Sequence, residues 1–365
     1  MDNTNLGGIR QTINYNNLTA STPYKSLFLD NKGDTTVNLL LGETKHKMFI
    51  ALNYYLGAAA RDNKATDSSI MRNLFANTNS PFTDIPSLKI LGSDLNNSSI
   101  NLRDLTSSSM ASESQNTKTY LNNLFGHLSA ISSFVNDTAV KGKAGKLGNY
   151  LVDEQGIETA QIIQKTMIGA TQVDYICNVL LDKGLEADNK TIISGKNYTQ
   201  LEQNWDEAYG FLTLNSIYLA GSTDAVKGTT ESLLGSYIWE YNKEAYAQIY
   251  PAFLKGRAAI ANNDMNTLKA QANFIRTQVE KALANAAVGY LAKWKSGATD
   301  AARAHAIAEG LGFVYSLRYC KLNGITPLFC DTQLNLLVNT NEGFWDLTNA
   351  KINTAIAAIS EKFNL

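Results

Sequence analysis

The spacing of apolar residues predicts long helices through the second half of the chain. Downstream of Asp264, a candidate N-cap, apolar side chains return every three or four residues and so share one helical face. These residues are Leu268, Ala272, Ile275, Val279, Leu283, Ala286 and Tyr290. Related patterns predict further helices over residues 155–182, 199–220, 230–261, 299–323 and 344–363, and strand signals are nearly absent.

The first half of the chain is less regular. Residues 1–44 contain several glycines and a proline and are expected to form an irregular leader with one helical turn or one short strand. Helices are predicted over residues 45–61 and 116–135. The polar connection from Asn77 to Ser114 is long for a compact domain, so we expect it to form the rim of a binding site.

These elements predict an all-α fold, a multi-helix antiparallel bundle that follows the irregular leader. Residues 45–365 are expected to form one all-helical domain or two packed bundles whose lobes meet near residues 140–150. The Gly- and Lys-rich stretch Lys141–Gly148 lies near this boundary. It is not expected to bind a nucleotide, because Leu147 follows Lys146 where a phosphate loop requires Ser or Thr.

Charge and cysteine content exclude several classes of function. The 32 Lys and Arg residues nearly balance 33 Asp and Glu residues, so the net charge of -1 gives no electrostatic footprint for nucleic acid or an anionic membrane. Three cysteines without a CxxC pair argue against a disulfide framework and a structural zinc site. Cys320 and Cys330 would meet only if the turn over residues 324–327 folded back, so buried free thiols are favoured.

The start of the chain carries no basic and apolar segments of a signal peptide, and no stretch reaches the roughly 18 apolar residues of a membrane span. The polar, Asn-rich start is nevertheless what remains when a signal peptide has been removed. We expect the protein to associate with a membrane only through a lipid anchor that the given sequence does not include. The sequence alone leaves this open.

His305 and Glu309 are the first candidates for chemistry. They stand four residues apart in a predicted helix and therefore project from the same face, where they would share a proton or a metal ion. The same geometry also satisfies two polar groups in a core, and this structural interpretation is favoured. His127, on another predicted helix without a carboxylate at i+3 or i+4, is expected to be a packed core histidine.

Asp206 and Glu207 are the second candidates. As neighbours they point about 100° apart on a helix, so one of them is expected to face inward. A salt bridge from either acid to Arg257, Arg276 or Arg318 is favoured over a role in a bundle metal site.

The helix that carries both acids has an apolar stripe that predicts burial, with Thr199 as its cap. The stripe consists of Leu201, Trp205, Ala208, Tyr209 and Leu212. Trp205 and Tyr209 are read as core residues in preference to a platform for a stacked ligand. Serine hydrolase chemistry is not expected, because the chain has no GxSxG motif and only three histidines.

Four ordered segments resemble the domain-of-unknown-function 4856 family of exported lipoproteins from Gram-negative bacteria. The segments are residues 150–156, 205–210, 253–260 and 305–313. Membership implies a lipoprotein of the periplasm or outer membrane. The family usually carries histidines just before the Trp205-Asp206-Glu207 run, where this chain has Gln203 and Asn204.

The segment around His305 is also similar to the GxHxxE signature of imelysin-like proteins, which are two-bundle helical proteins linked with bacterial iron uptake and classed as peptidases. Arg303 replaces the Gly of that signature, Ala308 stands at the Glu position, and Glu309 comes one residue late. The likeness therefore points to a fold and a setting.

Three functional hypotheses follow. The first is a non-enzymatic helical binding protein of the cell envelope that supports uptake of iron, haem or another nutrient, with a small molecule, a metal ion or an envelope protein as its partner. The second is an imelysin-like metallopeptidase, and the third is a purely structural or protein-interaction module. The candidate ligand-binding residues are Trp205, Asp206, Glu207, Tyr209, Arg257, His305 and Glu309, of which Glu207, His305 and Glu309 would hold an iron or zinc ion.

Overall fold

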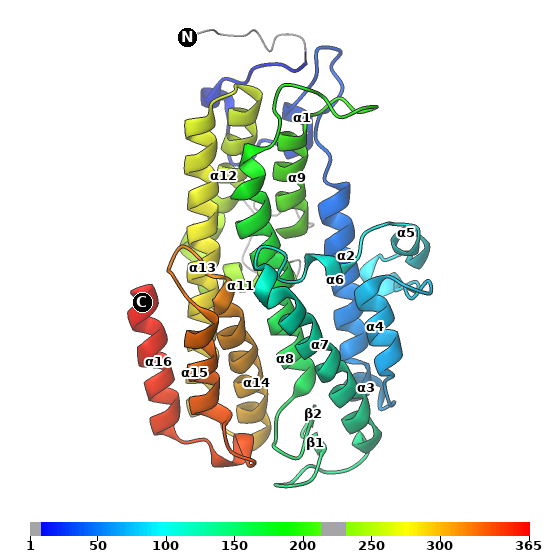
Figure 1. Cartoon of the computed structure of the whole chain (residues 1–365), viewed down its shortest axis with the longest axis vertical. Helices are drawn as coiled ribbons and strands as arrows, with labels where there is room; N and C mark the ends of the chain where they lie inside the picture. The colour runs from blue at the N-terminus through cyan, green and yellow to red at the C-terminus, as the bar shows by residue number, and fades with distance from the viewer. Residues whose placement is uncertain (1–8, 213–230) are drawn as a thin grey trace. The chain divides into compact units, whose positions relative to one another are not determined.

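The computed structural model describes residues 9–212 and 231–365, and helices carry nearly all the regular structure of this part of the chain (Figure 1). Within the described residues, the strands form a single two-stranded hairpin. The all-α class predicted from the sequence is therefore confirmed.

The chain folds into two compact units, and each unit consists of two segments that are distant in sequence. Unit 1 consists of residues 1–46 and 175–279, and unit 2 of residues 47–174 and 280–365. The divisions fall within three long helices, which are α2 (Leu40–Leu56), η4 (Ile168–Leu180) and α13 (Met265–Ser296). The lobe boundary predicted near residues 140–150 differs from these positions.

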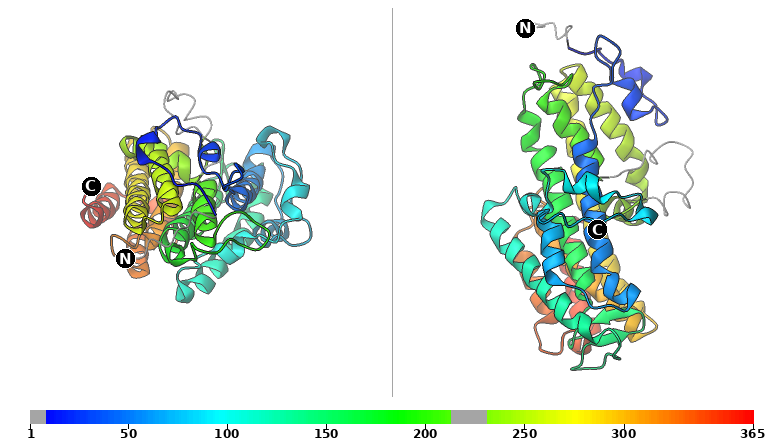
Figure 2. Two further views of the ribbon diagram at one scale, coloured as in Figure 1. Left: turned by 90° about the horizontal axis from the view of Figure 1, so that it is seen from above. Right: turned by 90° about the vertical axis from the view of Figure 1, so that its right-hand side faces the viewer.

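Unit 1 contains the N-terminal segment, residues 9–39, and helices from the middle of the chain. Apart from the three long helices, its elements are η1 (Tyr15–Asn17), α1 (Tyr24–Leu27), η5 (Lys183–Glu186), α9 (Gln200–Leu212), α11 (Leu234–Tyr241) and α12 (Lys243–Ala261). Helices α9 and α12 pack side by side, and the N-terminal segment, dark blue in Figure 2, lies against α12. The segment carries two single helical turns where one was expected, and α2 begins at Leu40, before the predicted end of the leader at residue 44.

The N-terminal end of α9 is fixed by a reciprocal cap that its sequence encodes. The backbone N–H of Glu202 donates to Thr199 Oγ1 at 3.3 Å, and the N–H of Thr199 donates to Glu202 Oε2 at 2.8 Å. This is the Thr-x-x-Glu capping box, which satisfies two backbone donors that a helix start leaves unpaired. The cap predicted at Thr199 is thereby confirmed.

Unit 2 is built around α14 (Asp300–Ser316), which packs extensively against α8 (Thr159–Met167) and also against α15 (Pro327–Val338). Its remaining helices are α3 (Ala58–Asp62), α4 (Ser68–Ala76), η2 (Pro86–Leu88), α5 (Gly92–Asn96), α6 (Leu102–Leu105), α7 (Ala111–Ile131), η3 (Ser132–Phe134), η7 (Leu317–Tyr319), η8 (Gly343–Asp346) and α16 (Asn349–Phe363). Antiparallel strands β1 (Gly145–Leu147) and β2 (Tyr150–Val152) pair Gly145 with Val152 and Leu147 with Tyr150.

Several predicted helix limits are wrong for identifiable reasons. The helix expected over residues 45–61 begins earlier, at Leu40, and is interrupted at Gly57 between α2 and α3. The helix expected over residues 155–182 continues beyond α8 as a π-helix, for which apolar spacing gives no separate signal. The helix expected over residues 230–261 is divided at Asn242, and residues 213–220 of the helix expected over residues 199–220 lie outside the described part of the chain.

Helices α4 and α15 of unit 2 are not predicted by the apolar pattern, and neither are the short helices α5 and α6 within the connection. In α15, Pro327 was read as part of a turn, but it occupies the first helical turn, where a missing N–H costs nothing. Thr326 caps this helix by accepting from the N–H of Phe329 at 3.2 Å. Proline just after a capping residue therefore marks a helix start here.

The Gly- and Lys-rich stretch Lys141–Gly148 leads into the hairpin of unit 2. Gly148 has a φ of +61° in the turn between the strands, and the next helix begins only at Thr159. This backbone lacks the loop-to-helix step of a phosphate-binding loop.

Cys177, Cys320 and Cys330 are buried free thiols, as the sequence favoured. None of the helices described in residues 9–212 and 231–365 combines the length and the apolar character that crossing a bilayer requires.

Gly256 of α12 is closely packed, so replacing it tests the packing that the structure shows around Trp205. A Cβ atom at this position would overlap Cζ2 of the fully buried Trp205 indole. At Gly126 of α7, the nearest atom to an added Cβ is Arg72 Nη2 at 3.5 Å, an ordinary contact. Both positions are helical, but only one has space for a methyl group.

We therefore expect opposite effects from the same substitution. Gly256→Ala should lower the free energy of unfolding by about 1–3 kcal/mol through overpacking. Gly126→Ala should raise it by about 0.5–1 kcal/mol, because alanine loses less conformational freedom in a helix. Urea denaturation of both variants measures this, and effects of the same sign would contradict the packing described at Trp205.

Candidate functional site

A buried ionic network joins α9 and α12 in unit 1. Arg257 is fully buried on α12 and donates from Nε to Asp206 Oδ1 at 2.9 Å and from Nη1 to Glu202 Oε1 at 2.6 Å. Its Nη2 donates to Thr36 Oγ1 at 2.9 Å. The salt bridge between Asp206 and Arg257, favoured from the sequence, is confirmed.

The N-terminal segment completes this network. Arg10 is buried and donates from Nη1 to Glu202 Oε2 at 2.9 Å. Asp206 accepts from the Tyr24 hydroxyl at 2.9 Å and from the backbone N–H of Asn38 at 3.1 Å. Two guanidinium groups and two carboxylates therefore meet in the buried interior of unit 1, and their formal charges cancel.

Burial and pairing oppose each other in the pKa values of this network. Burial raises the pKa of Asp206 to about 6, against the lowering effect of the Arg257 charge and of the donors from Asn38 and Tyr24. Burial also lowers the pKa of Arg257, but the Asp206 and Glu202 carboxylates outweigh it and raise the pKa overall. All four charges are consequently present at neutral pH.

Glu207, Trp205 and Tyr209 also belong to this buried region, each with its own partner. Glu207 points away from Asp206 and pairs with Lys45 Nζ at 2.8 Å. Trp205 donates from Nε1 to the carbonyl of Phe253 at 3.0 Å, and Tyr209 stacks on Tyr24 with ring centroids 4.6 Å apart. All three side chains are buried, so these candidates do not present an open surface.

His305 lies in unit 2 on α14, between two carboxylates. Its Nδ1 is 2.6 Å from Glu158 Oε2, and its Nε2 is 3.1 Å from Glu309 Oε1. The expected pairing of His305 with Glu309 is confirmed. Tyr150 of β2 stacks on the imidazole with ring centroids 4.2 Å apart.

The two carboxylates hold His305 in its charged form. Burial lowers its pKa, but hydrogen bonds to Glu158 and Glu309 outweigh this effect and raise the pKa to about 9. Burial opposes the shift of Glu309, whose pKa is nevertheless lowered to about 2 by His305 and by Lys165, with Nζ 3.4 Å from Glu309 Oε1. Two cations and two anions again balance in this cluster.

The geometry does not match the predicted metal site. Glu207 belongs to unit 1 and pairs with Lys45, whereas His305 and Glu309 belong to unit 2. Both ring nitrogens of His305 are engaged by carboxylates, and the described residues contain no group of three or more His, Cys, Asp or Glu side chains placed to hold a metal ion. The carboxylate and imidazole groups proposed as metal ligands thus already have protein partners.

The other two histidines also have structural surroundings. His127 is half-exposed, so the expectation of a histidine packed in the core is wrong. Its Nε2 lies 3.1 Å from Asp153 Oδ2, and this hydrogen bond raises the pKa of His127. Residue spacing gave no sign of Asp153, which follows 26 residues later. His46 is buried, and burial lowers its pKa to about 4.

Sequence reasoning missed Glu202, Arg10, Glu158 and Lys165 as members of the two clusters. Glu202 had a local signal, since it forms the capping box with Thr199. Glu158 had none, because it lies 147 residues from His305 and only the packing of the helices brings them together.

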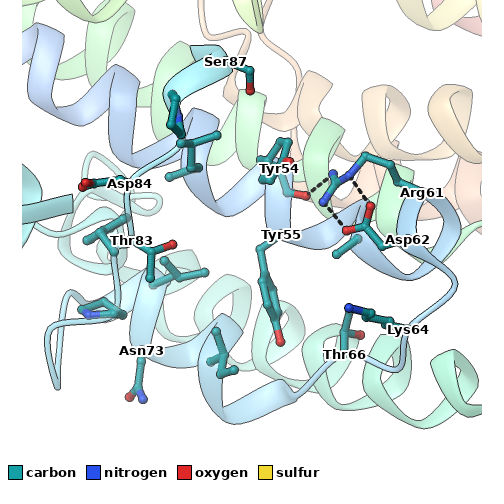
Figure 3. Close-up of a pocket in the computed structure, with 18 of the residues that line it drawn as sticks. Tyr54, Tyr55, Arg61, Asp62, Lys64, Thr66, Asn73, Thr83, Asp84 and Ser87 are labelled. Carbon is teal, nitrogen blue, oxygen red and sulfur yellow. Dashed lines mark hydrogen bonds and ion pairs between the residues drawn. The ribbon is translucent and has the colours of Figure 1, made fainter. Parts of the chain in front are cut away.

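The third feature is a groove in unit 2 (Figure 3). Unlike the side chains of the two ionic clusters, which pair with one another, its lining is open to a ligand. It has a volume of about 620 Å³, within the range of pockets that bind drug-sized molecules. By comparison, a cavity partly lined by Glu158 beside the His305 cluster measures about 120 Å³. The described residues that line the groove lie between Ala51 and Ser87, within one stretch of the chain.

Apolar side chains line most of the groove. They are Ala51, Tyr54, Tyr55, Ala58, Ala65, Ile70, Leu74, Pro81, Phe82, Ile85 and Pro86. The C-terminal part of α2, α3 and α4 supply one side, and residues 79–87 of the connection supply the other. The connection that the sequence marked as a binding-site rim thus forms a wall of this groove.

Local hydrogen bonds hold that wall in place. The side chain of Asn96 accepts from the N–H of Phe82 and donates to its carbonyl, both at 2.9 Å. Ile85 and Ile90 exchange two backbone hydrogen bonds, and Asp84 accepts from the N–H of Gly92 at 2.8 Å. The groove is therefore preformed by the fold of its own segment.

The unit 1 network predicts a large cost for removing Arg257. Arg257→Met should lower the free energy of unfolding by about 3–5 kcal/mol, because Glu202 and Asp206 would be left with one buried cation between them. Lys141→Met, which breaks an exposed pair with Glu342, should cost about 1 kcal/mol or less. Adding Asp206→Asn to Arg257→Met should recover part of the loss, and equal effects of the two single substitutions would refute a charge-balanced core.

The His305 cluster predicts a pH-dependent contribution to stability. A pKa raised from 6.5 to about 9 means that the charged imidazole stabilises the fold fully below pH 6.5, and that this contribution disappears as pH rises through about 9. His305→Gln should therefore cost ~2 kcal/mol at pH 6, and the gap from wild type should narrow by pH 9.5. Chemical denaturation across this range measures the gap, and a pH-independent gap would rule out the charged imidazole.

Comparisons with known proteins bear on the family alone. No match was found among curated proteins or among solved structures. A family model described as "Domain of unknown function (DUF4856)" matches residues 24–365, which include both ionic clusters apart from Arg10, and the whole groove. The chain therefore belongs to the DUF4856 family.

Proposed function

We propose that this protein is a non-enzymatic binding protein that takes a small organic molecule into the groove of unit 2 and supports nutrient uptake at the cell envelope. The groove is the observation that carries the proposal. It combines a volume of about 620 Å³, a largely apolar lining and a wall held by its own hydrogen bonds. Pockets of this size and character are the usual sites for small ligands.

The lining favours binding over catalysis. None of the described residues that line the groove is a histidine or a cysteine. In the described structure the Thr83 and Ser87 hydroxyls make no hydrogen bond to Asp62, Lys64 or Asp84, the lining groups that could act as a general base. The His305 cluster, which has acid and base groups, satisfies its charges internally. A metallopeptidase would need three metal ligands and an open position, which the described residues do not supply.

The same lining limits which nutrient fits. Among the described lining residues, the carboxylates are Asp62 and Asp84. Asp62 pairs with Arg61, and Asp84 accepts from a backbone N–H. Separate, engaged carboxylates suit an organic molecule or an organic chelate such as haem better than a bare iron or zinc ion. The setting in the cell envelope, as a lipoprotein, rests on the resemblance to exported relatives and is tested by fractionating the bacterium that carries the gene.

A fluorescent probe tests whether the groove binds ligands. N-phenylnaphthylamine is uncharged, apolar and fluorescent in apolar surroundings, and it should bind the wild-type protein saturably at one site. Ala58→Trp places an indole in the groove and should weaken this binding by about tenfold or more, because ligand and indole compete for the same volume.

The control is Ala350→Trp, at an exposed position on α16 outside the groove. It should leave the affinity unchanged, and both variants should unfold at the wild-type temperature. Probe binding that Ala58→Trp does not alter would place the site elsewhere and overturn the proposal.

A further inference from the structure

We infer that the ligand of this groove is a small organic anion with a ring-bearing apolar body, and that Lys64 pairs with its anionic group. This inference rests on the proposed function and adds the chemical class of the ligand. It follows from how charge is distributed among the residues of the lining.

The described lining of the groove includes four charged side chains, Arg61, Asp62, Lys64 and Asp84, and of its two cations only Lys64 is without a counter-ion in the described structure. Arg61 donates from Nε and Nη2 to the two oxygens of Asp62, at 3.0 and 2.8 Å, and from Nη1 to the carbonyl of Tyr54 at 2.8 Å. Its guanidinium carbon lies 3.7 Å from the centre of the Tyr54 ring, so both its charge and one face are occupied. Lys64 has no ion-pair or hydrogen-bond partner in the described part of the chain.

The placement of Lys64 suits a ligand lying along the groove. Figure 3 shows Lys64 on the same side as the Arg61–Asp62 pair, with its nitrogen turned towards Tyr55. An anion there would meet an exposed ammonium group whose charge is unbalanced. Thr66 lines the same end, and its Oγ1 has no hydrogen-bond partner in the described structure, so an acceptor oxygen would satisfy it.

The opposite side of the groove disfavours an anion. Asp84 lies across from Lys64 in Figure 3 and has no cationic partner among the described residues. Repulsion from its carboxylate and attraction to Lys64 would act in the same direction on a bound anion. A ligand with one anionic end is therefore oriented with that end at Lys64.

The apolar surface between Lys64 and Asp84 favours a ligand whose apolar part contains rings. Tyr54 and Ile70 each remain 38% exposed, and they line the groove with Tyr55 and Phe82. Aromatic side chains attract flat ring systems through stacked and edge-to-face contacts in addition to the gain from apolar burial. The Arg61–Tyr54 stack fixes one aromatic wall in place before any ligand arrives.

Two probes that differ in one group test the inference. Anilinonaphthalene sulfonate carries an anionic sulfonate on the ring framework of N-phenylnaphthylamine, which has none. Lys64→Met keeps most of the apolar stem and removes the charge, so it should weaken sulfonate binding by about tenfold and alter neutral-probe binding less than about twofold. Added salt should weaken only the binding of the anionic probe to the wild type.

Matched variants separate the possible outcomes. Lys362→Met, an exposed lysine on α16, should change neither affinity, and Ile70→Ala should weaken both probes to a similar extent. If Ala58→Trp blocks the neutral probe but Lys64→Met leaves the sulfonate affinity unchanged, the anion inference is overturned and the proposed function stands. If neither probe binds saturably at the groove, the proposed function fails and the inference fails with it.

Discussion

Unit 1 depends on the burial of Arg257 between two carboxylates. A guanidinium group removed from water is costly unless its donors and its charge are both satisfied, and here Glu202, Asp206 and Thr36 do so. These partners come from α9 and from the N-terminal segment, so the arrangement sets the positions of both relative to α12. The capping box at Thr199 serves the same end, because Glu202 Oε2 accepts from the start of the helix and from Arg10.

Unit 2 follows the same rule with different residues. His305 and Lys165 supply the cations, and Glu158 and Glu309 the anions, so charge is again balanced within the cluster. Balanced, hydrogen-bonded clusters are poor sites for a metal ion or an incoming charged ligand, since their groups must first give up existing partners. The residues with the most reactive side chains are therefore those that the fold uses for its own stability.

Function is better sought where the fold leaves groups without partners. The groove between α2, α4 and the connection exposes tyrosine and isoleucine side chains and an unpaired ammonium group. Its wall is a loop, but backbone and Asn96 hydrogen bonds fix that loop, so less ordering would be needed on binding. A preformed apolar site with an unpaired cation at one end and a carboxylate at the other selects a ligand by its shape and by the position of its charge.

The sequence by itself determined the all-helical class, the family, the burial of Trp205 and Tyr209, the cap at Thr199 and the pairing of His305 with Glu309. Each of these rests on periodicity, on spacing within a few residues or on contiguous motifs, which are local in the chain. The expectation that residues 77–114 form a binding-site rim also rests on local polar residues and prolines, and residues 79–87 of this connection line the groove.

Only the tertiary structure decided which distant residues meet. Arg10 lies 192 residues from Glu202, and Glu158 lies 147 residues from His305, so no spacing rule connects either pair. The structure also decided that Asp206 and Glu207 serve different partners, and that the acidic and histidine motifs are engaged by protein groups whereas the groove is open. Charge pairing across a core depends on which helices pack together. The periodicity of a single helix predicts which of its faces is buried, but it does not predict which helix packs against that face.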